Sequence, residues 1–421
     1  MSANKKRVAV AIGASAEAVY AIKQAQTLGF CTVAMDANPA APGLSAADHQ
    51  LVTDLRYAEQ VCLSLEKEQL IPSVVIPVPV GRILTTAGAV NNHFHLSGVS
   101  ADAAALVTDK CRFHLALAEA GLRDAQLTLL QTGTTALPAE MKDPNRYPLI
   151  IKPRYGAGSR GVRRCETEAE AAAALWAEDQ SPLTEDYIAE TCVTGMEYGV
   201  DGVYENGRFH LILLRQKRQT PPPYCQCVGY RAVVPGASQE TDRLLAAIRD
   251  LMTQAGQILG LSTCPVHADV LADEQNLLSS RPFLIELSAR PSGHHLHDLF
   301  TPMASGCDFI TEYMKCAVPE LALPWHFDVN NVRPLEIRYF DLPAGIVRAI
   351  PSPQDLRQLP GLVHYDCTLQ PGQILTPVHE GHDLMDRGCY ICEEIAPGCT
   401  ERLNRFIRNS FLIESSQEAY L

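Results

Sequence analysis

Two short β-prone runs separated by a helical segment open the chain and constrain its fold more than any other feature. Arg7–Ile12 is a compact apolar run, and Gly13–Ser15 forms a turn. Ala16–Leu28 then has the apolar spacing of an amphipathic helix, and Cys31–Met35 is a second apolar run. Because parallel strands need a crossover connection, this βαβ pattern predicts a parallel sheet at the N-terminus.

A dinucleotide-binding Rossmann domain is the first alternative for this segment. Its turn reads GASAEAV and lacks the second and third glycines that let a pyrophosphate approach the backbone. Asp36, which follows the second strand, would be the acid that binds ribose in such a domain. We therefore expect a structural sheet, with Asp36 capping the strand or touching a small substrate.

Composition narrows the range of partners. The 421 residues suggest several packed domains, and the formal net charge of −13 argues against nucleic acid or an anionic membrane surface as partner. No apolar run approaches membrane-spanning length. The 14 cysteines follow no regular framework and favour reduced thiols, so we expect a cytoplasmic protein.

The strongest local signal is PLIIKPRYGAGSRGV, residues Pro148–Val162. A buried strand delivers Lys152 as a fixed cation, and a glycine-rich turn ending at Gly161 follows it. Backbone N–H groups of such a turn can close over an anion, and Ser159 adds a hydroxyl donor. No Lys-Ser/Thr pair opens a following helix, so this is not a Walker loop.

Further along lies YIAETCVTGMEYGVD, with Glu190 and Glu197 on either side of a break at Gly195. In a strand–turn–strand, these acids could flank one nucleoside. Glu197 would accept hydrogen bonds from ribose, and the extended segment through Thr191 and Val193 would offer backbone groups to a base. Two exposed glutamates on a solvated strand are the alternative for this motif alone.

A third motif is a probable hairpin of two strand-like runs, Val266–Leu271 and Pro282–Leu287. Asp269 and Glu286 could then lie side by side, where their repulsion requires a cation between them. Carboxylate ligands with room for phosphate oxygens suit Mg²⁺.

Two polar residues follow on the same strand face. Ser288 could be a further weak metal ligand, and Arg290 could stabilise charge on a transferring phosphoryl group.

This ordered series resembles the ATP-grasp superfamily, and within it the L-amino-acid ligase and carnosine-synthase-like branch. PVGRILTTAGAVNNHFHLSGVS and TDKCRFHLALAEAGL resemble the start of the family's nucleotide domain, and RQTPPPYCQCVGYRAVVPG resembles this branch's Thr-Pro-Pro stretch beside the substrate cleft. The match covers most of the chain. Each motif is moderately specific, whereas their order is strongly so.

The resemblance implies roles for the residues at matching positions. The ATP-binding residues would be Lys110, Lys152, Ser159, Gly161, Glu190, Thr191, Val193 and Glu197. The metal ligands would be Asp269, Glu286 and Ser288. Lys152 and Arg290 would be catalytic. The substrate would contact Arg290, Gly293, His294 and Lys217.

The implied fold is a multidomain α/β and α+β ATP-grasp fold. A Rossmann-like pre-ATP-grasp domain would span residues 1–107, and the ATP-grasp domain 108–332, with a mobile lid at about 130–195. Residues 333–421 would form a small C-terminal α+β domain. The implied cofactors are ATP and Mg²⁺, with Mn²⁺ as an alternative, and a homodimer is the implied assembly.

The chain departs from the family at the metal site. Asp269 replaces the usual first Glu, and Ser288 replaces the usual Asn. Asp binds Mg²⁺ well, but a hydroxyl in place of a carbonyl weakens one ligand position and leaves the number of metal ions open.

Other polar residues leave alternatives open. His294, His295 and His297 could form a zinc site with Asp298, but contacts to a substrate carboxylate are favoured. For Lys217, a solvated strand and a substrate contact are equally supported.

The predicted function is an ATP-dependent carboxylate–amine ligase. It would form an amide through an acyl phosphate and release ADP and phosphate, using ATP and two small substrates, a carboxylate and an amine, both expected to be amino acids. A purine-pathway or carboxyphosphate-type ligase and a non-catalytic ATP-binding regulator are the alternatives.

Overall fold

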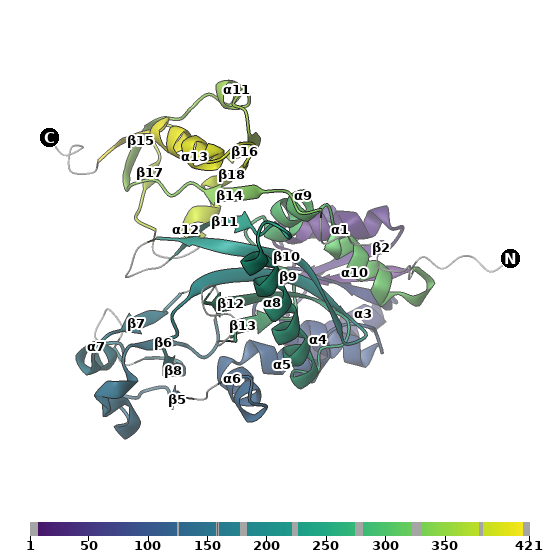
Figure 1. Cartoon of the computed structure of the whole chain (residues 1–421). Coiled ribbons are helices and arrows are strands. Elements are labelled where there is room, and N and C mark those ends of the chain that lie inside the picture. The colour runs from purple at the N-terminus through teal and green to yellow at the C-terminus, as the bar shows by residue number, and fades with distance from the viewer. Residues whose placement is uncertain are drawn as a thin grey trace.

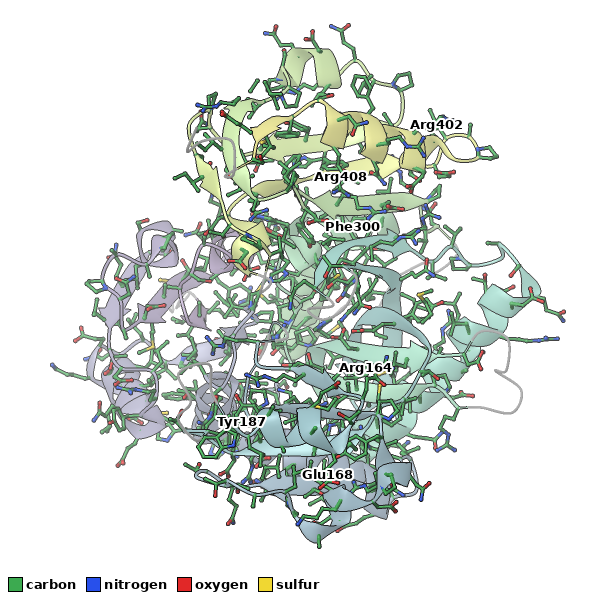
Figure 2. The ribbon with its side chains drawn as sticks, turned by 90° about the vertical axis from the view of Figure 1, so that its left-hand side faces the viewer. Arg164, Glu168, Tyr187, Phe300, Arg402 and Arg408 are labelled. Atoms are coloured by element: carbon green, nitrogen blue, oxygen red, sulfur yellow. The ribbon has the colours of Figure 1, made fainter. Side chains whose placement is uncertain are left out.

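The computed structural model describes residues 7–123, 126–156, 158, 160–176, 183–220, 226–273, 281–321, 331–378 and 382–415. Within these ranges the strands form four sheets (Figure 1). Figure 2 shows the same ribbon from the side, with Glu168 and Tyr187 in the lower part and Arg402 and Arg408 in the upper part. Among the described helices, none combines the length and apolar character needed to cross a membrane.

The N-terminal sheet is parallel, as the βαβ pattern predicts. Its four strands have the order β3-β2-β1-β4: His49–Val52, Cys31–Asp36, Val8–Ile12 and Pro72–Ile76. Between them run α1 (Ala18–Thr27), α2 (Pro42–Ala46) and α3 (Ala58–Lys67). Asp36 caps the strand end, because its Oδ2 accepts a hydrogen bond of 2.8 Å from the Ala14 N–H.

Three helices connect this sheet to the rest of the molecule: α4 (Leu84–His93), α5 (Ala101–Thr108) and α6 (Lys110–Glu119). Asp109 is the N-cap of α6, and its Oδ1 accepts from the backbone N–H groups of Cys111 and Arg112. The same carboxylate binds Arg154, with an Nη2–Oδ2 distance of 2.6 Å. The start of α6 is thereby tied to the segment that precedes the glycine loop.

A small antiparallel sheet follows, with the order β5-β8-β6-β7: Leu127–Leu130, Tyr187–Thr191, Leu149–Pro153 and Arg163–Cys165. Its own core includes Met141, Leu149, Ile151 and Leu175. A short helix, α7 (Glu168–Ala173), follows β7.

The largest sheet is antiparallel and has eight strands in the order β13-β12-β9-β10-β11-β14-β18-β16. These span Phe283–Ser288, Cys264–Ala272, Met196–Glu205, Arg208–Gln219, Cys227–Ala232, Leu335–Tyr339, Gly388–Glu393 and Leu362–Cys367. The break at Gly195 therefore separates β8 and β9 into different sheets, rather than joining them as a pair.

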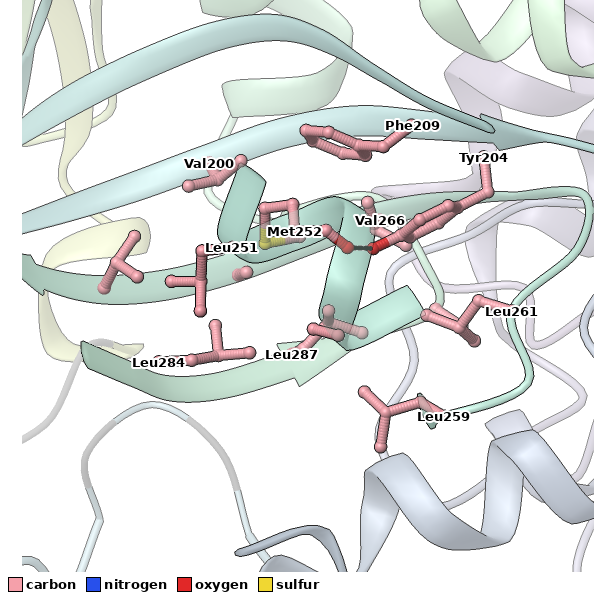
Figure 3. Packing of buried hydrophobic residues seen from close by; sticks show 14 of the residues in the cluster. Val200, Tyr204, Phe209, Leu251, Met252, Leu259, Leu261, Val266, Leu284 and Leu287 are labelled. Atoms are coloured by element: carbon pink, nitrogen blue, oxygen red, sulfur yellow. Dashed lines mark hydrogen bonds between the residues drawn. The ribbon is translucent and has the colours of Figure 1, made fainter. Parts of the chain in front are cut away.

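One face of this sheet is apolar and packs on the long helix α8 (Gln239–Ile258), as Figure 3 shows. Val200 and Tyr204 of β9 lie against Leu251 and Met252, and the Tyr204 hydroxyl donates a hydrogen bond to the Met252 carbonyl. Because side chains alternate along a strand, β9 turns Glu197 and Asp201 to the opposite face. That face borders the site described below.

The C-terminal segment completes the molecule. It adds β14, β18 and β16 to the large sheet, and forms a three-stranded sheet from β17 (Ile374–Leu375), β15 (Gly345–Ala349) and β19 (Leu412–Glu414), with α13 (Cys399–Asn409) beside it. The large sheet thus continues across residue 332. The proposed division of the chain into three domains stays a prediction.

Candidate active site

Two cavities adjoin at the polar face of the large sheet. The first has a volume of about 290 Å³ and lies between the small sheet and strands β12 and β13. The second, of about 340 Å³, lies between the large sheet, the N-terminal domain and the loop Ser292–His294. Asp269, Glu286 and Gly158 line both cavities. Two molecules, one bound in each cavity, would therefore lie next to each other at Asp269 and Glu286.

The hairpin β12–β13 brings the two acids together, as its alternation predicts. Asp269 pairs with Glu286, and His267 pairs with Ser288. Oxygen and nitrogen atoms of His267, Asp269 and Glu286 lie within 4.8 Å of one another. Two carboxylates and an imidazole are suitable ligands for a divalent cation. Ser288 lies on the strand where the resemblance places a ligand.

Lys217 lies between Glu197 and Asp269, two acids that line the first cavity. Its Nζ is 2.5 Å from Glu197 Oε1 and 2.6 Å from Asp269 Oδ2. Burial acts to lower the pKa of Lys217, but the charges of Asp269 and Glu197 outweigh it and hold this pKa well above its ordinary value. Lys217 is thus a fixed cation beside the predicted metal ligands.

Lys152 is held by a buried carboxylate. It is the fourth residue of β6, and its Nζ lies 2.5 Å from Glu190 Oε1 on the neighbouring strand β8. The other oxygen of Glu190 accepts from Arg123, whose guanidinium stacks on the Phe283 ring at 4.2 Å. Glu190 is therefore not a solvated glutamate. Its carboxylate positions Lys152, while the backbone from Thr191 onward borders the first cavity.

Lys110 connects α6 to the glycine loop. Its Nζ donates a hydrogen bond of 2.6 Å to the Gly156 carbonyl and lies 4.0 Å from Glu286 Oε2. Burial is the main cause that lowers the pKa of Lys110. Gly158 and Gly161 have φ angles of +69° and +71°, which favour glycine. Ser159 lies outside the described residues, as do Pro221–Cys225 of the Thr-Pro-Pro stretch.

Several basic groups line the first cavity. They are Lys110, Lys152, Arg160 and Arg164. The cavity also has an apolar lining, formed by Ile150, Val162, Val193, Leu271, Phe283 and Ile285. Phosphates need cations and a purine ring needs apolar walls, so this combination suits a nucleoside triphosphate. The sequence motifs do not predict a role for Arg160 or Arg164, although Arg160 belongs to the glycine-rich motif.

Arg290 lies in the second cavity and is anchored to the N-terminal domain. Its Nε donates to the Val80 carbonyl at 3.1 Å, and its Nη1 donates to the Pro291 carbonyl at 2.8 Å. Burial is the main cause that lowers the pKa of Arg290. Arg290 follows the end of β13 at Ser288, where the chain turns into the loop that carries His294, His295 and His297.

Gly293 and His294 meet Glu17, the residue directly before helix α1. The His294 N–H donates a hydrogen bond of 2.5 Å to Glu17 Oε1. A Cβ at Gly293 would lie 2.8 Å from the same oxygen, so a side chain at this position would have to displace the Glu17 carboxylate. Nothing in the sequence around Glu17 indicated this contact, which depends on docking of two distant segments.

The other two histidines of this loop both lie beside Asp298, and His297 also faces the backbone at Glu17. His295 Nδ1 lies 3.3 Å from Asp298 Oδ2, and His297 Nε2 lies 3.2 Å from the Glu17 carbonyl. Among the described residues, the group whose ligand atoms converge is His267, Asp269 and Glu286. The zinc alternative for this loop therefore gains no support from the arrangement.

Comparisons with known proteins agree with this geometry. Residues 145–296 match a family model described as ATP-grasp domain. The chain contains an ATP-grasp domain. No curated protein sequence matches the chain significantly.

Solved structures with the same fold extend the likeness to nearly the whole chain. An L-amino acid ligase from Bacillus licheniformis aligns with a TM-score of 0.74 and 17% identity, covering 99% of this chain and 100% of that one. A phosphoribosylglycinamide synthetase from Anaerococcus prevotii aligns with a TM-score of 0.69 and 18% identity, over 98% and 100%. An N5-carboxyaminoimidazole ribonucleotide synthetase from Thermotoga maritima reaches 0.67 with 15% identity, over 98% and 100%.

The TM-scores show a shared fold: the chain is built like multidomain ATP-grasp ligases, with a parallel N-terminal sheet and a large antiparallel sheet.

Proposed function

We propose that the protein is an ATP-dependent carboxylate–amine ligase that joins two amino acids. The observation that carries this proposal is the meeting of two cavities at Asp269 and Glu286, one suited to a nucleotide and one open to a second molecule. Phosphoryl transfer between two bound substrates needs such a junction, because the attacking oxygen and the γ-phosphate must lie in line.

ATP would occupy the first cavity. Its phosphates would lie near Lys110 and Lys152, the base against the backbone of Thr191–Val193, and the ribose near Glu197. Glu190 would keep the Lys152 ammonium in place, so that no reorganisation is needed when charge develops. A divalent cation at Asp269 and Glu286, Mg²⁺ or Mn²⁺, would neutralise charge on the phosphate oxygens.

The acyl donor would occupy the second cavity. Its carboxylate oxygen would attack the γ-phosphorus, forming the new P–O bond as the bond to ADP breaks. Arg290, held by the Val80 and Pro291 carbonyls, would face the acyl phosphate. The amine of the second substrate would then attack the acyl carbon, and the C–N bond would form as phosphate leaves.

Water must be excluded while the acyl phosphate exists. Gly158 lines both cavities, and a segment that moves at this position could cover the junction. This supports the proposal that the lid spans about 130–195.

The experiment that tests this proposal measures phosphate release from Mg·ATP with pools of amino acids and small carboxylic acids. Release that needs two co-substrates and is lost in Glu286→Gln would support the ligase, and splitting the active pools would identify its partners. Glu168→Gln, on the exposed surface of α7, is the matched control.

Other outcomes would favour the alternatives. Release that needs bicarbonate or a purine intermediate would instead assign a carboxyphosphate or purine-type ligase. ATP binding without turnover in any pool would favour a regulator, a reading to which Ser288 contributes by weakening one ligand position.

A further inference from the structure

His267 faces the two acids that would hold the cation. It lies two residues before Asp269 on β12, so both side chains point to the same face of the sheet. Its Nε2 is 3.6 Å from Asp269 Oδ1. That oxygen is buried and accepts no hydrogen bond from a described residue, whereas Oδ2 is bound by Lys217 at 2.6 Å. Asp269 therefore offers one unused oxygen, on the side of the imidazole.

The other ring nitrogen of His267 faces a buried carboxylate. His267 Nδ1 lies 3.7 Å from Asp201 Oδ1, and Asp201 is fully buried. Arg215 donates to Oδ1 of Asp201 at 2.8 Å, and the Thr301 hydroxyl donates to Oδ2 at 2.6 Å. Burial acts to raise the pKa of Asp201, but the Arg215 charge, His267 and Thr301 outweigh it and keep the pKa well below the ordinary range.

An ionised carboxylate behind one imidazole nitrogen has a recognised consequence. Its charge favours the tautomer with the proton on Nδ1, in which the lone pair of Nε2 faces Asp269. Asp201 Oδ1 is too distant from Nδ1 for a hydrogen bond, and Arg215 Nη2 lies 3.4 Å from the same nitrogen, so a cation at Nε2 would have to select this tautomer. The sequence contains the signal in the motif HADV, where a histidine and an acid alternate on one strand.

We propose that His267 is a nitrogen ligand of the cation held by Asp269 and Glu286. This inference rests on the proposed metal site of the ligase. The His267 imidazole would compensate for the weak ligand Ser288, which occupies the position where the family resemblance implies an amide carbonyl. An imidazole among the ligands shifts the preference of the site from Mg²⁺ toward transition metals such as Mn²⁺ and Co²⁺.

The test uses Mn²⁺ as the probe, bound to the full chain with ADP and examined by pulsed electron paramagnetic resonance. Wild-type protein is expected to show nitrogen coupling to Mn²⁺. Protein containing ¹⁵N-labelled histidine should show the ¹⁵N pattern instead, which excludes the nitrogens of adenine and lysine as the source.

Two variants test whether His267 is the histidine whose nitrogen couples to Mn²⁺. His267→Asn should lose the histidine coupling and lower the affinity for Mn²⁺ relative to Mg²⁺ by about tenfold or more. His294→Asn, in the second cavity but outside the converging group, should retain both. Thermal unfolding of each variant checks that the fold is intact, and the labelled wild type gives an answer even if His267→Asn fails to fold.

Binding of Mn²⁺ without histidine coupling would overturn this inference alone. It would mean that the opposite tautomer is present, in which Nδ1 accepts from Arg215, 3.4 Å away, and Nε2–H faces Asp269. Failure of Mn²⁺ to bind at all would overturn the metal site of the proposed function as well.

Discussion

The ammonium group of Lys217 lies 2.6 Å from Asp269 Oδ2, at the junction of the two cavities. The side chains are 9% and 12% exposed, so the pair is largely removed from water. Glu197 binds the same ammonium at 2.5 Å. Lys217 thus contacts both Glu197, which is predicted to bind ribose, and Asp269, which is predicted to bind the cation.

Lys217→Met should destabilise the metal-free protein and make its stability depend on divalent cations. Removing one partner of a buried pair leaves the other charges uncompensated, at a cost of about 3–5 kcal/mol. A cation at Asp269 would replace part of the lost charge. Thermal unfolding with and without Mg²⁺ or Mn²⁺ measures this, and a variant whose melting temperature rises no more than that of the wild type on adding metal would contradict it.

Glu190→Gln should weaken ATP binding through Lys152. The substitution removes the charge that holds the Lys152 ammonium and the Arg123 guanidinium. We expect the KM for ATP to rise by roughly ten- to a hundredfold, as for loss of a hydrogen bond to a charged group. Steady-state kinetics with saturating co-substrates measures this, with the exposed Glu168→Gln as control. An unchanged KM for ATP would show that Lys152 needs no positioning.

The features of the fold and of the site that could be predicted depend on residues close together in sequence. The pairing of Asp269 with Glu286 follows from the period of two in adjacent strands of one hairpin, and the parallel sheet follows from βαβ patterning. Both depend on local rules, and the structure confirms both.

The contacts that could not be predicted join distant segments. Lys217 reaches Asp269 only because β9 lies between β10 and β12, an order that no local pattern specifies. Glu17 reaches His294 through docking of the first helix on a loop that follows β13. Glu190 was predicted beside a base, but its burial against Arg123 depends on the position of the segment after α6.

Gly293→Ala should impair the second cavity while leaving ATP binding intact. The new Cβ would lie 2.8 Å from Glu17 Oε1 and disturb the hydrogen bond from the His294 N–H. We expect a higher KM for the carboxylate or amine substrate and an unchanged KM for ATP, because Gly293 lines the second cavity and not the first. Equal changes in all three KM values would instead indicate a general distortion.

Glu336→Gln should make the stability of the protein less sensitive to acid. Glu336 on β14 is fully buried, and it accepts from Arg338 and Arg231 at 2.5 Å and 2.7 Å and from Asn404 of α13 at 3.0 Å. Burial acts to raise the pKa of Glu336, but the two arginine charges outweigh it and lower the pKa below its ordinary value. The folded state therefore binds fewer protons at this site than the unfolded state.

This difference in bound protons determines how the stability of the protein changes with pH. The stabilisation from Glu336 is present above the pKa of an unfolded glutamate, about 4.3, and is lost as the pH falls through the lower folded pKa. The variant lacks this pH-dependent contribution, although it should be less stable than the wild type at pH 7, because Arg218, Arg231 and Arg338 lose their counter-charge. Urea unfolding at pH 7 and at successively lower pH compares the two proteins. Parallel losses of unfolding free energy in both would contradict the assignment and place the acid-sensitive carboxylate elsewhere, with the Asp201–Arg215 pair as the next group to examine.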